Sequence, residues 1–189
     1  MKQAKVLTDK EIKRTLEFID AHDRHSERNR ALVLVSYYLG LRVGELANLK
    51  YDDVFNASCE VNDVIYLTAE QTKGSKGRRV FVNKKARQAL IRYRDSVLSG
   101  IQHGYLFETQ KSTRFNTNAL TQLLKRLYER VGIVGASSHS MRRTFITKLA
   151  TSGVSVRVIA ELVGHKSIQT TQRYIDINDE LMSNAVELV

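Results

Sequence analysis

The chain contains no proline in its 189 residues, and its ten glycines are scattered rather than gathered into a linker. Proline and clustered glycine are the residues that most strongly interrupt helices and mark the junctions between domains. Over most of the chain, apolar residues recur every three or four positions, which is the spacing of one helix face. These features predict a single, mainly helical domain over residues 1–189.

The expected helices are apolar-periodic runs, and Thr8, Ser26, Asn83 and Thr117 are placed to cap four of them. These runs cover residues 9–22, 26–39, 43–49, 84–98, 117–130 and 179–188, and Ser138, Ser155 and Ser167 are placed to cap three further helices, the last reaching residue 177. Between residues 61 and 82 the pattern changes to two β-rich runs, 64–68 and 79–82, on either side of a glycine-containing turn. The fold class is therefore expected to be mainly α with a small antiparallel β-hairpin.

The charge of the chain indicates its partner. Thirty Lys and Arg residues against twenty Asp and Glu residues give a net charge of +10, which favours a polyanion, with nucleic acid first. Cys59 is the single cysteine, which excludes an internal disulfide and indicates a reducing, cytoplasmic compartment. The most apolar stretch, residues 31–41, is too short to cross a membrane, and the first residues contain no secretion signal.

A histidine and an arginine stand three positions apart near the start of a predicted helix, at His139 and Arg142. This spacing places both on one face, and the free amides of a helix N-terminus favour a phosphate there. Taken alone, the segment is better explained as a solvated basic helix. Arg143 lies a further 100° around the helix, which indicates a surface charge or a contact to a nucleic-acid backbone.

A second arginine, Arg42, lies in an otherwise apolar segment, where its charge needs a partner. Glu45 follows three residues later and is the expected partner, although a purely structural ion pair explains the two residues as well. The hairpin turn is also basic, with Lys73 before it and Lys76, Arg78 and Arg79 after it. Such a tip is suited to entering a groove, but basic tips also serve solubility.

His165 and Tyr174 are nine residues apart, a spacing that would put them on opposite sides of one continuous helix. Gly164 and Ser167 predict a break in the helix, so that both side chains can face one site. Tyr174 lies off the apolar stripe of its segment, which weakens a role in packing.

Together these segments resemble the catalytic domain of the tyrosine recombinases, also called the phage integrase family. The matching pieces occur in the order of the family and cover about residues 8–186: Gly40-Leu41-Arg42-Val43-Gly44-Glu45-Leu46, Thr72-Lys73-Gly74, His139-Ser140-Met141-Arg142-Arg143-Thr144, and Gly164-His165 with Tyr174. Gly44 and Met141 depart from the family pattern, but neither is a reacting group.

The resemblance implies a role for each matching residue. Arg42 and Arg142 would hold the scissile phosphate, His139 and His165 would hydrogen-bond to it, Lys73 would protonate the departing 5′ oxygen, Tyr174 would be the nucleophile, and Glu45 would support the site. Lys76, Arg78, Arg79, Arg143, Lys166 and Arg173 would contact double-stranded DNA. No cofactor or metal is implied, because a tyrosyl phosphate conserves the energy of the phosphodiester bond.

The resemblance further implies a site-specific recombinase or integrase that works as a homo-tetramer on DNA, with the helix over 179–189 docked on a neighbouring protomer. Members carry a separate core-binding domain before the position of Thr8, which only seven residues precede here. The chain is expected to be a catalytic fragment or a naturally small recombinase. Alternatives are a DNA-binding regulator without turnover and a type IB topoisomerase. A metal-dependent nuclease is disfavoured, because Asp52-Asp53 is the only adjacent acidic pair in the first half.

Overall fold

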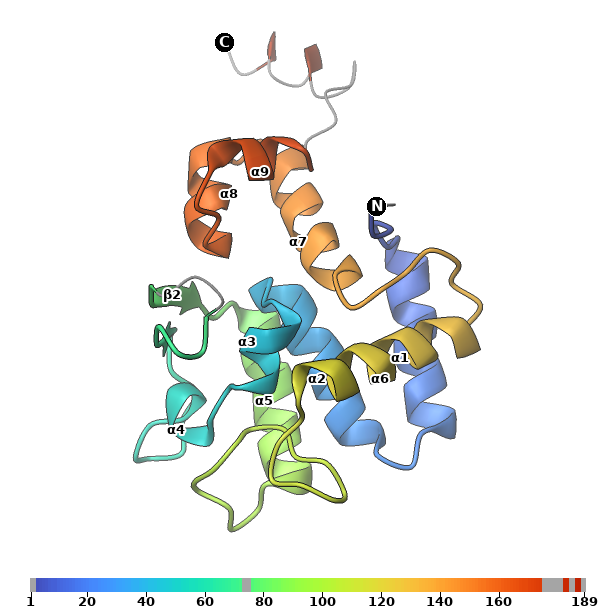
Figure 1. The fold of residues 1–189 in the computed structure, drawn as a ribbon, viewed down its shortest axis with the longest axis vertical. Coiled ribbons are helices and arrows are strands. Elements are labelled where there is room, and N and C mark those ends of the chain that lie inside the picture. Colours follow the sequence, from blue (N-terminus) through green and yellow to red (C-terminus); the bar gives the residue numbers. More distant parts are fainter. Residues whose placement is uncertain (1–2, 73–75, 175–181, 184–185, 188–189) are drawn as a thin grey trace.

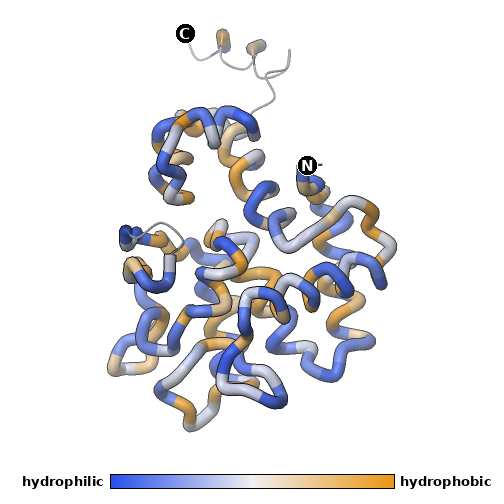
Figure 2. Tube along the Cα trace, in the orientation of Figure 1, coloured by the Kyte–Doolittle hydropathy of each residue, from blue (hydrophilic) through white to orange (hydrophobic). Residues whose placement is uncertain are grey.

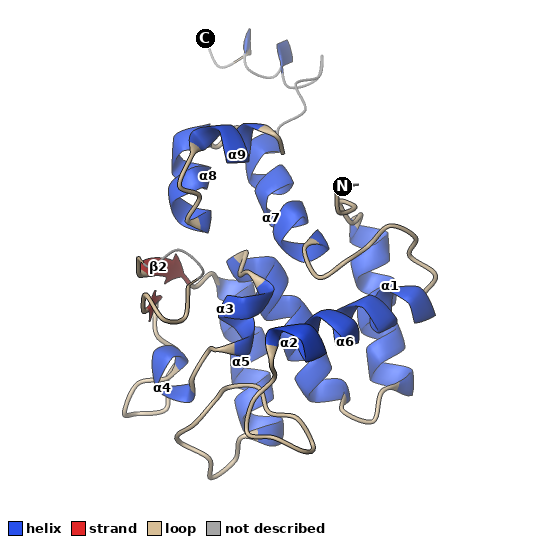
Figure 3. Ribbon diagram, viewed as in Figure 1, coloured by secondary structure: helices blue, strands red, loops and turns tan. Residues whose placement is uncertain are grey.

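The computed structural model describes residues 3–72, 76–174, 182–183 and 186–187. The described part is mainly helical with one two-stranded antiparallel sheet, as the sequence predicts (Figure 3). In chain order the elements are α1 Asp9–His22, α2 Ser26–Leu39, α3 Val43–Ala47, α4 Tyr51–Val54, β1 Val64–Leu67, β2 Arg78–Phe81, α5 Lys84–Val97, α6 Thr117–Arg130, α7 Ser140–Thr151, α8 Val156–Val163 and α9 Ile168–Gln172.

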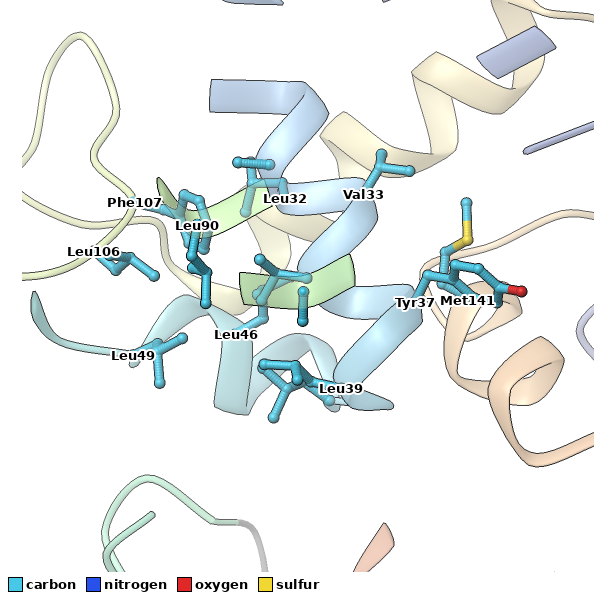
Figure 4. Close-up of a cluster of buried hydrophobic side chains, with 14 of the residues drawn as sticks. Leu32, Val33, Tyr37, Leu39, Leu46, Leu49, Leu90, Leu106, Phe107 and Met141 are labelled. Atoms are coloured by element: carbon cyan, nitrogen blue, oxygen red, sulfur yellow. The ribbon is translucent and has the colours of Figure 1, made fainter. Parts of the chain in front are cut away.

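Helix α2 forms the centre of the main body and packs against α1, α5 and α7 (Figure 1). It is buried because its second half is apolar on nearly every side, from Ala31 to Leu39. Figure 4 shows Leu32 and Val33 of α2 among the buried side chains, with Tyr37 beside Met141 of α7. The core of the main body therefore extends from α5 across α2 to the start of α7.

The last three described helices form a smaller unit above the main body (Figure 1). Ile146 and Ala150 of α7 pack with Ile159 and Val163 of α8 in a second apolar cluster. The tube in Figure 2 shows orange, hydrophobic segments on α7 alternating with blue, hydrophilic ones. Because α7 contributes to both clusters, it fixes the smaller unit against the main body.

Two glycines end helices by adopting the left-handed conformation that side chains disfavour. Gly40 follows α2 with a φ of 59°, and Gly164 follows α8 with a φ of 64°. Ser167 is extended before α9, so the chain breaks between His165 and this helix as predicted. Helix α9 ends at Gln172, short of the expected residue 177, and residues 175–181 lie outside the described part.

Further expectations differ from the structure. Ser26 and Thr117, expected as caps, are the first residues of α2 and α6, whose N-caps are His25 and Asn116. Ser138 was expected to cap α7, but the N-cap is His139, which makes no side-chain capping bond. The short helix α4 was not expected. It forms because the Asp53 carboxylate accepts a hydrogen bond from the Lys50 amide at 2.8 Å, which caps its first turn. The helix expected over residues 179–188 falls largely on residues that are not described.

Candidate functional site

A buried carboxylate organises the site. The Glu45 side chain at the start of α3 is 1% exposed, and it accepts hydrogen bonds from the Arg42 guanidinium at 2.8 Å and from Nη2 of Arg78 at 2.7 Å. Nη1 of Arg142 lies 3.9 Å from the same carboxylate. Burial alone would raise the pKa of Glu45, but the hydrogen bonds and charge of Arg78 outweigh it, and the pKa lies below its ordinary value. Glu45 is therefore ionised at neutral pH.

Backbone carbonyls fix the two arginines of the predicted motifs. Arg142 donates from Nη1 to the Gly40 carbonyl and from Nη2 to the Val163 carbonyl, both at 2.6 Å. Arg42 donates from Nη2 to the Gly164 carbonyl at 2.7 Å. These carbonyls are available because α2 and α8 end there, which leaves their last carbonyl groups without helical partners.

Both arginines keep donors for a ligand. A guanidinium has five N–H groups, and within the described residues two of them are engaged in each arginine, which leaves three. Burial and the nearby Arg42 charge lower the pKa of Arg142 to about 9, so it remains positively charged at neutral pH. The structure thus brings two preorganised cations to one point, a suitable arrangement for a phosphate.

His165 follows the α8 cap and lies within this cationic group. Its Nδ1 is 2.8 Å from Oγ1 of the buried Thr171 on α9. Burial, together with the charges of Arg142 and Arg42, lowers the pKa of His165 to about 4. The imidazole is therefore neutral at pH 7, with one N–H to donate and one nitrogen that can accept a proton.

Tyr174 lies at the end of α9 and next to His165, as the sequence predicts. The two rings are stacked with their centroids 5.9 Å apart, and the Tyr174 amide donates to the Thr171 carbonyl at 2.9 Å. The ring also packs against the second apolar cluster, and the Arg143 guanidinium carbon lies 5.7 Å from its centroid. Packing therefore holds the ring beside His165 and Arg143.

His139, the remaining predicted histidine, is exposed at the N-cap of α7, one turn before Arg142. Its amide donates to Oγ of Ser137 at 3.2 Å, and its Nδ1 lies 3.4 Å from Oγ of Ser138. The Ser138 hydroxyl, expected to cap the helix, is thus close to the imidazole instead. The exposed imidazole therefore lies at the start of α7, on the turn that precedes Arg142.

A cleft of about 820 Å³ lies between the hairpin and the segment that joins α8 to α9. Its lining residues are Arg42, Thr72, Lys76, Gly77, Arg78, Glu161, Gly164, His165, Lys166 and Thr170. Lys76 and Lys166 are exposed, one on each side, so the cleft offers cations at its rim as well as at its base. Arg79 and Arg173 are also exposed, but neither lines this cleft.

Two expected DNA contacts occupy other positions in the structure. Arg78 was expected at the basic tip of the hairpin, but its side chain is 8% exposed, pairs with Glu45, and donates to the Leu162 carbonyl at 2.8 Å. It points inward because residues alternate between the two faces of a strand, and Arg78 shares the inner face with Val80. Arg143 was expected on the surface, but it lies against Tyr174. Lys73 lies outside the described residues.

The sequence interpretation missed the groups that hold these side chains. Thr171 and the carbonyls of Gly40, Val163 and Gly164 each contact a predicted residue. The two glycines carried a signal as helix ends, because the carbonyls at a helix end lack partners. Thr171 carried none, since nothing in its local pattern relates it to His165.

The described residues contain no group of three or more His, Cys, Asp or Glu side chains placed to hold a metal ion. Within the same residues, no helix combines the length and the apolar character needed to span a membrane.

Comparison with known proteins places these observations in a family. The profile of the phage integrase family matches residues 5–180. The chain is 34% identical over 186 residues to the tyrosine recombinase XerA of Thermococcus kodakarensis, covering 97% of this chain and 62% of that protein. It is 37% identical over 155 residues to XerD of Corynebacterium glutamicum, covering 79% and 48%. The chain thus spans about half to two thirds of the length of these relatives.

The solved structures agree on the fold. A crystal structure of the XerA recombinase matches all of this chain and 66% of its own with a TM-score of 0.77 and 31% identity. XerH bound to its difH substrate matches 98% of this chain and 55% of its own with a TM-score of 0.69 at 23% identity, which shows the fold alone. A mainly helical domain with a small sheet is therefore the fold shared by this chain and these recombinases.

Proposed function

Because the chain belongs to the phage integrase family, we propose that it breaks and rejoins DNA strands through a covalent bond between Tyr174 and a 3′ phosphate. The observation that carries this proposal is that Arg42 and Arg142 are held on the adjacent carbonyls at the end of α8, directly before His165, which stacks on Tyr174. Arg42 and His165 also line the cationic cleft. The four residues come from four separate segments of the chain, and a purely structural ion-pair cluster has no need of the tyrosine.

The two arginines would bind the non-bridging oxygens of the scissile phosphate. Each has three N–H donors without a partner among the described residues, and Glu45 and the helix-end carbonyls hold both guanidinium groups in place before DNA arrives. Preorganised donors of this kind typically lower a barrier by about 3 to 4 kcal/mol each. The cations would thus stabilise the negative charge on the phosphoryl oxygens without a metal ion.

The proposed reaction forms one bond for each bond it breaks, so it needs no cofactor. The Tyr174 oxygen attacks phosphorus, the new bond joins tyrosine to the 3′ phosphate, and the bond to the 5′ oxygen breaks. The departing 5′ oxygen takes a proton, for which the family resemblance assigns Lys73. His139 would hydrogen-bond to the phosphate. Neutral His165, whose Nδ1 faces Thr171, would accept at Nε2 the proton that tyrosine loses, and the N–H formed there would hydrogen-bond to the phosphate. A 5′ hydroxyl from another strand reverses these steps and completes the exchange.

Double-stranded DNA is the proposed substrate, and Lys76, Arg79, Lys166 and Arg173 are exposed to contact its backbone. Crystal structures that share the fold support this assignment: XerH and the Tn1549 transposon integrase were each solved with DNA. Site-specific recombination by a homo-tetramer on DNA is proposed on the family resemblance, as is docking of residues 179–189 on a neighbouring protomer.

Covalent capture tests the proposal. Nicked duplexes that carry DNA from around the gene, together with a random-sequence pool, are incubated with wild-type protein and with Tyr174→Phe and resolved on a denaturing gel. The proposal predicts an adduct in the wild type and none in the variant. Bound DNA without an adduct in the wild type would contradict it and favour a regulator, whereas plasmid relaxation without recombinant products would favour a topoisomerase.

A further inference from the structure

Arg143 contacts the side chain that the proposed function makes the nucleophile. Its guanidinium carbon lies 5.7 Å from the Tyr174 ring centroid, within the range of a cation–π interaction. Arg143 directly follows Arg142 on α7, but a helix turns by about 100° per residue. Arg142 therefore reaches the Glu45 cluster while Arg143 reaches the tyrosine, so that one turn of α7 serves both parts of the site.

The guanidinium of Arg143 is fixed from its other side by the start of the chain. Its Nη1 donates to the Ala4 carbonyl at 2.7 Å. The same segment is held in place by two further hydrogen bonds, from the Leu7 amide to Oγ1 of Thr144 at 2.8 Å and from the Lys5 amide to the Gly135 carbonyl at 3.1 Å. Residues 4–7 thus lie along α7, beside the residue that faces the tyrosine.

We propose that Arg143 is a positioning residue that holds the Tyr174 ring for attack and ties it to the segment of residues 4–7. This inference rests on the proposed function, because it concerns the geometry of its nucleophile. Tyr174 follows the short helix α9, which has five residues, and its ring needs lateral support to keep a single orientation. His165 stacks on the ring at 5.9 Å, and Arg143 supplies the second polar contact.

A role in binding the DNA backbone is the competing interpretation, and the surroundings of Arg143 disfavour it. The side chain is half-buried, its Nη1 is engaged by Ala4, and its Nε is buried with no partner among the described residues. Arg143 is also absent from the lining of the cleft, where Lys76 and Lys166 lie at the rim. A guanidinium enclosed in this way is directed toward the ring rather than toward a passing phosphate.

The test separates positioning from binding by measuring the rate of adduct formation at saturating nicked DNA and, separately, the affinity for that DNA. Arg143→Met removes the cation and keeps much of the volume, while Arg143→Lys keeps the charge without the planar fork. Arg126→Met is the matched control, because Arg126 is exposed on α6 and makes no hydrogen bond or ion pair within the described residues. All three variants are checked for folding by circular dichroism.

We expect Arg143→Met to form the adduct roughly tenfold more slowly than Arg126→Met, the size of a partly buried cation–π contact, with nearly equal affinity for DNA. Arg143→Lys should recover part of that rate. Equal rates in the two methionine variants would overturn the proposal. A loss of affinity that accounts for the whole loss of rate would also overturn it, and would restore the DNA-contact interpretation.

A spectroscopic measurement tests the contact without relying on DNA chemistry. The chain has eight tyrosines, so 3-fluorotyrosine labelling gives eight fluorine signals, and Tyr174→Phe identifies the one from Tyr174. That signal should shift in Arg143→Met and stay in place in Arg126→Met. An unmoved signal would refute the contact. A wild type that forms no adduct would instead refute the proposed function, while the fluorine signal still decides whether Arg143 holds the ring.

Discussion

Replacing Glu45 with glutamine should destabilise the fold far more than a loss of one surface charge. The carboxylate is 1% exposed and accepts four hydrogen bonds: the Arg42 amide at 2.8 Å, the Arg42 guanidinium at 2.8 Å, and Arg78 at 2.7 and 3.2 Å. Glutamine keeps one acceptor oxygen, but its NH2 group would face N–H donors of Arg42 or Arg78 and could accept no hydrogen bond from them. The buried arginine charges around residue 45 would then have no counter-ion.

Removing one partner of a buried ion pair costs about 3 to 5 kcal/mol. For a chain of 189 residues, each kcal/mol lowers the melting temperature by about 2 to 4 °C, so Glu45→Gln should lower it by roughly 6 to 20 °C. Glu129→Gln is the control, since that carboxylate is exposed and pairs with Lys125 at 3.6 Å. It should cost less than about 0.5 kcal/mol.

The assay is urea unfolding followed by far-UV circular dichroism at pH 7 and at acidic pH. The lowered pKa of Glu45 means that its contribution is complete above its ordinary value of 4.5 and is lost as the pH falls through the folded-state value. The difference between wild type and Glu45→Gln should therefore shrink in acid. A Glu45→Gln protein within 1 kcal/mol of Glu129→Gln at pH 7, an order-of-magnitude bound on surface effects, would refute this reasoning.

Three further outcomes are expected. His165 should titrate with a pKa of about 4 by NMR, and a midpoint near 6.5 would contradict this. Its contribution to the free energy of unfolding, about 1 to 2 kcal/mol after solvent screening, should be lost as the pH falls from about 6.5 toward 4. Gly40→Ala should lower the free energy of unfolding by about 2 to 3 kcal/mol, because φ is 59° and a Cβ would lie 2.5 Å from the Phe145 ring. The control Gly153→Ala places its Cβ more than 4 Å from any atom beyond the adjacent residues and should cost about 1 kcal/mol, as measured by chemical denaturation. Lys76→Ala should reduce the salt slope of DNA binding by about 0.9, and an unchanged slope would exclude a backbone contact.

The local signals in the sequence are strongest where one residue's chemistry decides the outcome. The capping box at Thr8 sets the start of α1, and a helix over about residues 9–22 is what the sequence predicts and the structure shows. The helix ending at Arg130 is predicted as well, but its cap is Asn116, which accepts from the Ala119 amide at 2.7 Å, and not the expected Thr117. In such segments the capping signal and the apolar spacing indicate the same helix, so tertiary contacts change its bounds little.

The sequence singles out several of the residues that the structure brings together, but it does not show how they are arranged. Arg78 and Arg143 both appeared to be surface cations, because sequence spacing cannot show which residue from a distant part of the chain a side chain will contact. Arg78 meets Glu45 33 positions earlier in the chain, and Arg143 meets Ala4 139 positions earlier. Contacts at such separations depend on how α3, the hairpin and α7 come together, and no local pattern encodes them.

The most direct test of the central claim is to locate the covalent bond itself. The wild-type adduct is digested with nuclease and protease, and tandem mass spectrometry identifies the residue that carries the nucleotide. Our account predicts a 3′-linked nucleotide on Tyr174 and on no other tyrosine. A nucleotide on another residue, or cleaved DNA ends with no protein attached, would contradict the assignment of Tyr174 as the nucleophile.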